Sequence, residues 1–103
     1  MARGAGRIPT LSSKETLILE LLVQKELYGL QLVAASKRRL KRGTIYVTLA
    51  RMETKGYVTS RAEDPPPDAG GLPRRMYRPT ALGRRVLETW TQVARRLMPE
   101  FAR

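Results

Sequence analysis

The cations of this sequence are concentrated in one stretch of the chain. No acidic residue occurs between Leu27 and Met52. The cations of that window are Lys37, Arg38, Arg39, Lys41, Arg42 and Arg51. The whole chain carries 20 Lys and Arg against 9 Asp and Glu, which gives a net charge of +11. Because clustered lysine and arginine side chains bind phosphate oxygens, this composition favours nucleic acid or an anionic membrane surface as a partner.

The sequence offers few groups for catalysis or metal binding. It contains no cysteine and no histidine, which removes disulfides, thiolate chemistry and the usual zinc ligands. The carboxylates are scattered or lie in a loose loop, so no acid–base pair is placed. The Gly-Ala-Gly at residues 4–6 has no strand before it and does not make a nucleotide loop. We therefore expect no enzyme activity, no catalytic residue, no metal and no cofactor.

The apolar runs of the chain are short. The longest, LILELLV at residues 17–23, is too short to cross a bilayer. The N-terminal residues include arginines but no long apolar core, so a signal peptide is not expected. A soluble cytoplasmic protein without a membrane partner is the expectation.

The cationic cluster leads directly into a helical pattern at residues 43–55. Ile45, Leu49 and Met52 have the i, i+4, i+7 spacing of a narrow core face. Gly56 supplies the left-handed position that ends a helix. The opposite face carries mostly small residues, which let the helix come close to another molecule.

Two cations, Lys41 and Arg42, stand at the start of this predicted helix. The helix dipole disfavours cations there by a few tenths to about 1 kcal/mol. The arrangement becomes favourable when an anion also binds. We therefore predict a phosphate site formed by these two side chains and the free amides of the helix start.

Two further helices are predicted before this one. Ser12 and Glu15 have the spacing of a capping box, and the helix that they begin is apolar almost all round. A small monomer can bury only one face of such a helix, so the helix is expected to meet a second subunit as well. Tyr28-Gly29 then breaks the chain, and a second short helix is predicted from Leu30 to Ser36.

A β-hairpin and a last helix complete the predicted fold. Residues 57–62 and 74–79 are predicted strands, joined by a loose tip at 63–73 that is rich in proline and glycine. Thr80 is the predicted cap of a helix over roughly 81–98, and its apolar stripe is wider than packing on one small domain requires. This order predicts a mainly α protein with a small β-hairpin, namely a winged helix-turn-helix with an appended C-terminal dimerisation helix.

Three segments are predicted along the chain. Residues 1–10 form a flexible basic arm, residues 11–79 form the winged helix-turn-helix domain, and residues 80–103 form the C-terminal dimerisation helix.

Three stretches of the sequence resemble the PadR family of transcriptional regulators. They are YGLQL at 28–32, GTIYVTLARMETKGYVTSR at 43–61 and GGLPRRMYRPTALG at 70–83. The resemblance extends from about Leu17 to Trp90. It implies a homodimeric repressor that binds double-stranded DNA, with the third helix in the major groove and the hairpin wing along the backbone or minor groove. The first and last helices form the dimer interface in such proteins, and many relatives bind a small, often aromatic, effector near it and then release DNA.

The sequence departs from the family pattern at three places. Relatives commonly carry a Ser-Pro-like cap where this chain has Lys41-Arg42, and leucine where it has Pro79. The wing tip here is acidic, with Glu63, Asp64 and Asp68, so the tip is expected to repel phosphate.

The DNA contacts are predicted on the third helix, the loop before it and the base of the wing. The candidates for base contacts are Thr44, Val47, Thr48 and Arg51. The candidates for phosphate contacts are Lys37, Arg38, Arg39, Lys41, Arg42, Tyr46, Arg74 and Arg75. For each base candidate taken singly, an exposed structural role is about as good an interpretation. Tyr46 lies at the side of the helix, where it packs on the wing, bonds a phosphate, or does both; Tyr77 is expected in the core.

The dimer interface is predicted on the first and last helices. Its candidates are Leu19, Leu22, Val23, Val86, Leu87, Trp90, Val93, Ala94 and Leu97. Trp90 has two interpretations: interface packing, which we favour, and stacking with an aromatic effector.

A second class of function stays open at this point. The same sequence fits a basic winged-helix adaptor or anti-repressor that acts through protein–protein contacts, with its charge serving RNA or membrane.

Overall fold

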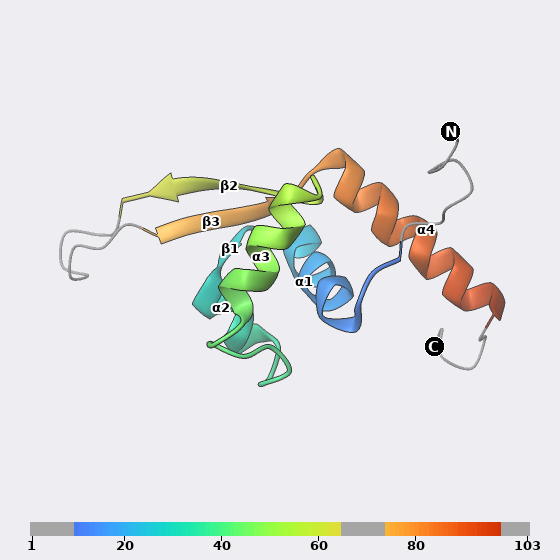
Figure 1. The fold of residues 1–103 in the computed structure, drawn as a ribbon, viewed down its shortest axis with the longest axis horizontal. Coiled ribbons are helices and arrows are strands. Elements are labelled where there is room, and N and C mark those ends of the chain that lie inside the picture. The colour runs from blue at the N-terminus through green and yellow to red at the C-terminus, as the bar shows by residue number, and fades with distance from the viewer. Residues whose placement is uncertain (1–9, 65–73, 98–103) are drawn as a thin grey trace.

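The computed structural model describes residues 10–64 and 74–97, and its elements follow the predicted order with one addition (Figure 1). The elements are α1 (Ser13–Gln24), β1 (Leu27–Tyr28), α2 (Gly29–Ala35), α3 (Ile45–Thr54), β2 (Val58–Glu63), β3 (Arg74–Pro79) and α4 (Ala81–Leu97). The predicted winged helix-turn-helix with an appended helix is confirmed. Residues 1–9 of the predicted basic arm, most of the wing tip (65–73) and the predicted end of the last helix at 98 lie outside the described residues.

The sheet has three antiparallel strands in the order β1-β3-β2. The predicted hairpin pairs Val58 with Pro79 and Ser60 with Tyr77. The additional strand β1 pairs Leu27 with Tyr77, so the central strand β3 is covered on both edges. Tyr77 is buried, as predicted. The sequence pattern did not predict β1, because a two-residue strand is too short to show an alternation of apolar and polar residues.

The predicted capping box begins α1. The Ser12 hydroxyl accepts a hydrogen bond from the Glu15 amide at 3.1 Å, and the Ser12 amide donates to the Glu15 carboxylate at 2.9 Å. Two of the amides at the start of the helix are thereby satisfied. The start of α1 is fixed by this contact, and it lies beside α3.

The hydrophobic core receives side chains from all the helices and strands, and its most deeply buried members come from α1, α2, α3 and the first residue of β2. Its fully buried side chains are Ile18, Leu19, Leu22, Leu32, Ile45, Leu49, Met52 and Val58. The predicted core face of α3 is therefore confirmed.

The burial corrects part of the predicted dimer interface. Leu19, Leu22 and Val86 are 0%, 2% and 5% exposed within a single chain, so they have no surface left for a partner. Their apolar character serves the core of one copy. The sequence pattern showed that these positions are apolar but not which surface covers them.

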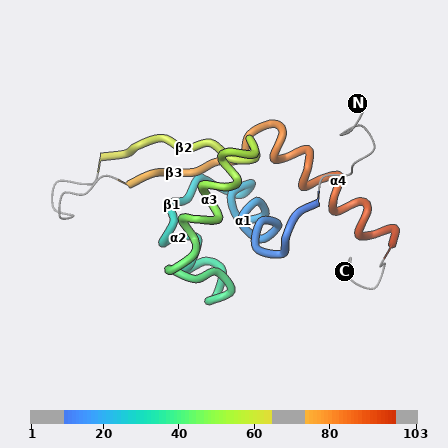
Figure 2. Tube along the Cα trace, viewed as in Figure 1, coloured from blue at the N-terminus to red at the C-terminus, as the bar shows by residue number. Residues whose placement is uncertain are grey.

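Helix α4 is joined to the domain through Thr80 and Gly83. The Thr80 hydroxyl donates to the Gly56 carbonyl at 2.5 Å and accepts from the Gly83 amide at 2.9 Å. Gly83 lies so close to the Tyr57 carbonyl that a Cβ atom at this position would collide with the backbone. From this joint α4 passes along α1 and then extends away from the sheet (Figure 2).

Candidate nucleic-acid interface

Helix α3 buries one face in the core and exposes the rest of its surface. Ile45, Leu49 and Met52 point into the core, whereas Tyr46 and Val47 are 52% and 54% exposed. At 100° per residue, Tyr46 and Glu53 project to one side of the helix. The directions away from the core are available to another molecule.

Tyr46 covers the start of α2. A Cβ atom at Gly29 would stand 2.5 Å from Tyr46 Cε1 and 2.8 Å from its hydroxyl oxygen, so the ring lies directly against this glycine. The Tyr-Gly pair at 28–29 therefore has a packing reason, because any side chain at 29 would displace Tyr46. The sequence did not predict this partner for the ring.

A groove of about 440 Å³ separates the other side of α3 from the start of α1. Its lining residues are Ser12, Lys14, Glu15, Thr44, Val47, Thr48, Arg51 and Lys55. All four base-contact candidates thus meet in one place, together with Lys14, which was not among the predicted contacts. The Thr48 hydroxyl donates to the Thr44 carbonyl at 3.1 Å, so its proton is already used within the helix.

A partly buried ion pair forms part of the lining of this groove. Lys55 Nζ lies 2.7 Å from Glu15 Oε2, and Glu15 is almost fully buried. Burial acts to raise the pKa of Glu15, but hydrogen bonds from Lys55 and Ser12 outweigh it, and the pKa is lowered. The carboxylate is therefore charged and holds the end of α3 against the start of α1.

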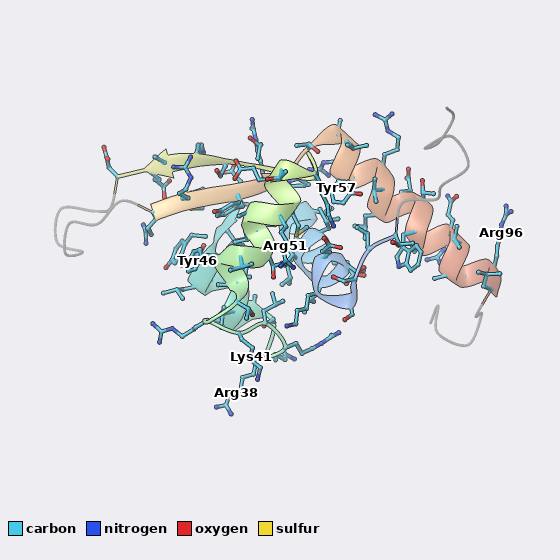
Figure 3. All side chains as sticks on the ribbon, in the orientation of Figure 1. Arg38, Lys41, Tyr46, Arg51, Tyr57 and Arg96 are labelled. Atoms are coloured by element: carbon cyan, nitrogen blue, oxygen red, sulfur yellow. The ribbon has the colours of Figure 1, made fainter. Side chains whose placement is uncertain are left out.

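The loop that joins α2 to α3, residues 36–44, is called the basic loop below. Lys37 and Arg38 have φ values of 54° and 73°, in the left-handed region. This conformation costs a residue with a side chain roughly 1–2 kcal/mol. Figure 3 shows the side chains of Arg38 and Lys41 directed away from the body of the fold.

Ser36 and Leu40 hold the strained backbone of the basic loop. The buried Ser36 hydroxyl donates to the Val33 carbonyl at 2.7 Å and accepts from the Leu40 amide at 2.9 Å. The Leu40 side chain is buried in the core. These contacts leave the cations of the loop at the surface, and none of them forms an ion pair within residues 10–64 and 74–97.

One part of the predicted phosphate site needs correction. The amides of Thr44 and Ile45 both donate to the Lys41 carbonyl, at 3.2 and 2.9 Å. These amides are not free for an anion, because the loop turns back on itself just before α3. The exposed side chains of Lys41 and Arg42 remain available to a phosphate.

Two cations of the wing, Arg61 and Arg74, are engaged inside the chain. Arg61 lies 2.7 Å from Glu26. Arg74 lies 3.9 Å from Glu63, and its guanidinium stacks 4.6 Å from the centre of the Tyr28 ring. This packing does not support a phosphate role for Arg74.

Arg75 is connected to α3 by a hydrogen-bonded chain. Its Nε donates to the Ser60 hydroxyl at 3.0 Å, and that hydroxyl donates to the Glu53 carboxylate at 3.0 Å. Arg75 is exposed, so its remaining guanidinium donors still face solvent. Among the two arginines at the wing base, Arg75 is the one available to an outside anion.

The end of the molecule around α4 carries exposed apolar surface. Leu97 is 74% exposed, and Leu82 and Val23 are also exposed. Trp90 is half-buried and packs on the core cluster. A groove of about 720 Å³ between the end of α1 and α4 is lined by Val23, Leu87 and polar residues of α4, and Trp90 is not among its lining residues.

Comparison with known proteins identifies the family. The family model described as "Transcriptional regulator PadR-like family" matches residues 18–89. The chain belongs to the PadR-like family of transcriptional regulators. The family resemblance seen in the three sequence stretches is thereby confirmed. Among proteins with curated functions, none matches this sequence significantly.

Solved structures of PadR regulators have the same fold. The chain is similar to a PadR family transcription regulator from Clostridium difficile R20291, with 31% identity, a TM-score of 0.72, and 87% and 98% of the two chains covered. It is similar to Bacillus subtilis PadR in complex with operator DNA, with 25% identity and a TM-score of 0.70, over 80% of this chain and 48% of that one. A PadR family regulator from Eggerthella lenta DSM 2243 has 27% identity and a TM-score of 0.71, over 86% and 78%.

The described part of the chain contains neither a membrane-spanning helix nor a cluster of metal ligands. No helix of residues 10–64 and 74–97 is long and apolar enough to cross a membrane. The same residues contain no cluster of His, Cys, Asp or Glu suited to a metal ion.

Proposed function

We propose that the chain is a sequence-specific transcriptional regulator that binds double-stranded DNA as a homodimer and acts as a repressor. The observation that carries this proposal is the basic loop, whose cations are exposed and without an acidic partner in the described residues, directly beside the exposed faces of α3. A helix with a cationic loop at its amino end suits docking into the major groove amino end first. The B. subtilis relative crystallised on operator DNA supports the same class of partner.

The contacts divide into two groups under this proposal. Bases are read by Thr44, Val47, Thr48 and Arg51, of which Arg51 is the candidate for guanine. Phosphates are bound by Lys37, Arg38, Arg39, Lys41, Arg42, Tyr46 and Arg75. Arg74 is left out because it stacks on Tyr28.

The proposed dimer uses the apolar surface that one copy leaves exposed on α1 and α4. Its candidates are Val23, Leu87, Trp90, Val93, Ala94 and Leu97. Two-fold symmetry would place two copies of α3 on an inverted repeat, with half-sites about 10–10.5 bp apart or a multiple of this distance. Light scattering at micromolar concentration should give about twice 11.7 kDa.

Release by a small aromatic effector is the last part of the proposal. The groove between α1 and α4 has the volume of ordinary ligand sites. Trp90 is the proposed aromatic contact from the neighbouring face of α4. A tryptophan fluorescence titration with a panel of small aromatic compounds tests this part by itself.

Selection of double-stranded DNA from a random pool tests the central proposal. The expected result is an enriched inverted repeat, bound more tightly than random DNA. The adaptor alternative predicts no enrichment of any DNA sequence, and binding to RNA or anionic vesicles that is equal to or stronger than binding to DNA. Arg51→Ala should cost about 1–3 kcal/mol per half-site on the selected operator and little on random DNA.

A further inference from the structure

The outward strip of α3 consists of Val47, Ala50 and Thr54. The three residues stand at i, i+3 and i+7, so they share one face of the helix. All three are exposed, and Val47 is 54% exposed. The strip contains no charged side chain.

Three residues beside this strip already have partners in the fold. On the wing side, Glu53 accepts from Ser60 at 3.0 Å, and Tyr46 lies on Gly29. On the α1 side, Lys55 pairs with Glu15 at 2.7 Å. The outward strip, together with Arg51 beside it, is therefore a part of α3 that is left to touch an outside molecule at close range.

The charges around the outward strip limit what this molecule can be. Lys41 and Arg42 stand at its amino end, Arg51 flanks it, and all three are exposed. A partner must offer negative charge to this rim and apolar groups to the small side chains in the middle. A DNA major groove meets both conditions, because thymine C5-methyl groups project between two rows of phosphates.

We propose that Val47, Ala50 and Thr54 read the C5-methyl groups of thymines in the operator. This inference rests on the proposed function of DNA binding and names the base feature that α3 reads. The Val47 methyls and the Thr54 methyl would contact thymine methyls, and the small Ala50 would let the helix backbone approach the bases. Thr48 does not take part as a donor, because its hydroxyl proton is bonded to Thr44 at 3.1 Å.

Replacement of thymine by deoxyuracil in the selected operator tests the proposal. Deoxyuracil keeps the pairing edge and the O4 acceptor and removes only the methyl group. At each contacted position we expect about a fourfold loss of affinity, which corresponds to the burial of one methyl-sized group. Thymines that the outward strip does not contact should tolerate the replacement without a loss of affinity.

A variant pair connects this loss to the outward strip. Val47→Ala should bind thymine and deoxyuracil operators with equal affinity at one position of each half-site, because the partner of the methyl is gone. Arg51→Ala is the matched control from the same helix; it should bind more weakly but keep the full preference for thymine. Both positions are exposed, and circular dichroism checks that the variants fold.

The outcomes separate this inference from the proposed function. Tight operator binding that no deoxyuracil replacement changes would overturn the methyl reading and leave DNA binding standing. A Val47→Ala variant that keeps the full thymine preference would assign the methyl contact elsewhere and also overturn the role of the strip. If the chain binds no DNA, the proposed function fails, and this inference fails with it.

Discussion

The basic loop and the wing are both rich in arginine, yet Arg61 and Arg74 of the wing are engaged within the described part of the fold and the cations of the loop are not. In the basic loop the cations lie at the surface, on a backbone with two left-handed residues, and none is ion-paired within the described residues. In the wing, Arg61 pairs with Glu26 and Arg74 is held between Tyr28 and Glu63. The number of cations in a segment therefore does not tell how many of them can bind a phosphate.

The difference follows from where the acids of the chain lie. Glu26 and Glu63 stand beside the sheet, within reach of the wing arginines, whereas the basic loop lies inside a window without any acid. Cations that are left together repel one another, and the strained backbone adds to the cost. A bound phosphate would offset the repulsion, so the loop has the properties of a site that is completed by its ligand.

The largest effect is expected from Ser36→Ala, which removes the hydroxyl that holds the backbone of the basic loop. The variant leaves the buried Leu40 amide without its partner, and we expect a loss of about 1–3 kcal/mol in the free energy of unfolding. DNA affinity should fall as well, because the loop cations lose their fixed positions. Urea unfolding and DNA titration measure the two effects.

Ser60→Ala is the matched control in the wing. The Ser60 hydroxyl bonds to exposed partners, Glu53 and Arg75, so its removal should change stability by less than about 0.5 kcal/mol. An equal loss of stability in both serine variants would contradict the distinction between a strained, supported loop and a relaxed wing.

A smaller effect is expected from Glu15→Gln, which acts at the other end of α3. The folded state lowers the pKa of Glu15 from its ordinary value of 4.5, so the ion pair contributes stability above that value, and the contribution is lost as the pH falls through the lower, folded pKa. The variant should lose about 1 kcal/mol near neutral pH, since Lys55 is half exposed. The difference from the parent should shrink as the pH falls below 4.5 and vanish once the folded carboxylate is protonated.

Glu26→Gln is the control for this pH dependence. Its partner Arg61 is exposed, so the pair should add little stability at any pH. Urea unfolding between about pH 7 and pH 3 measures both variants. If the free energy of unfolding of Glu15→Gln and Glu26→Gln differed from that of the parent in the same way at every pH, the role of Glu15 would be contradicted.

The smallest effect is expected from Arg38→Gly. This variant should raise the stability of the fold and lower the affinity for DNA. Glycine adopts the φ of 73° without a steric cost, which should stabilise the fold by about 0.5–1 kcal/mol after its own entropy loss. The lost cation should weaken binding to every DNA sequence. A variant that is stabilised and binds DNA as well as the parent would mean that Arg38 is not a phosphate contact.

Local signals in the sequence predicted most of the fold. The Ser12–Glu15 capping box, the core spacing of Ile45, Leu49 and Met52, and the hairpin before Thr80 depend on neighbouring residues, and all are present in the structure. The family motifs gave the same architecture, and the family model confirms them.

Contacts between distant residues were not predictable from the sequence. Glu15 and Lys55 are 40 residues apart, and Arg61 and Glu26 are 35 apart, so nothing local pairs them. The left-handed Lys37 and Arg38 lack the glycine or asparagine that signals this conformation. The candidate DNA contacts stay predictions, because their roles depend on a partner.

The salt dependence of DNA binding tests whether the cations of the basic loop bind phosphates and those held in the wing do not. It is measured for two double variants, Lys41→Ala/Arg42→Ala and Arg61→Ala/Arg74→Ala. Each pair removes two cations, one pair from the basic loop and one from the wing. We expect the loop pair to lower the slope of log affinity against log salt by about two per subunit, or about four in the dimer, and the wing pair to leave it nearly unchanged. A wing pair that flattens the slope as much as the loop pair would contradict the account.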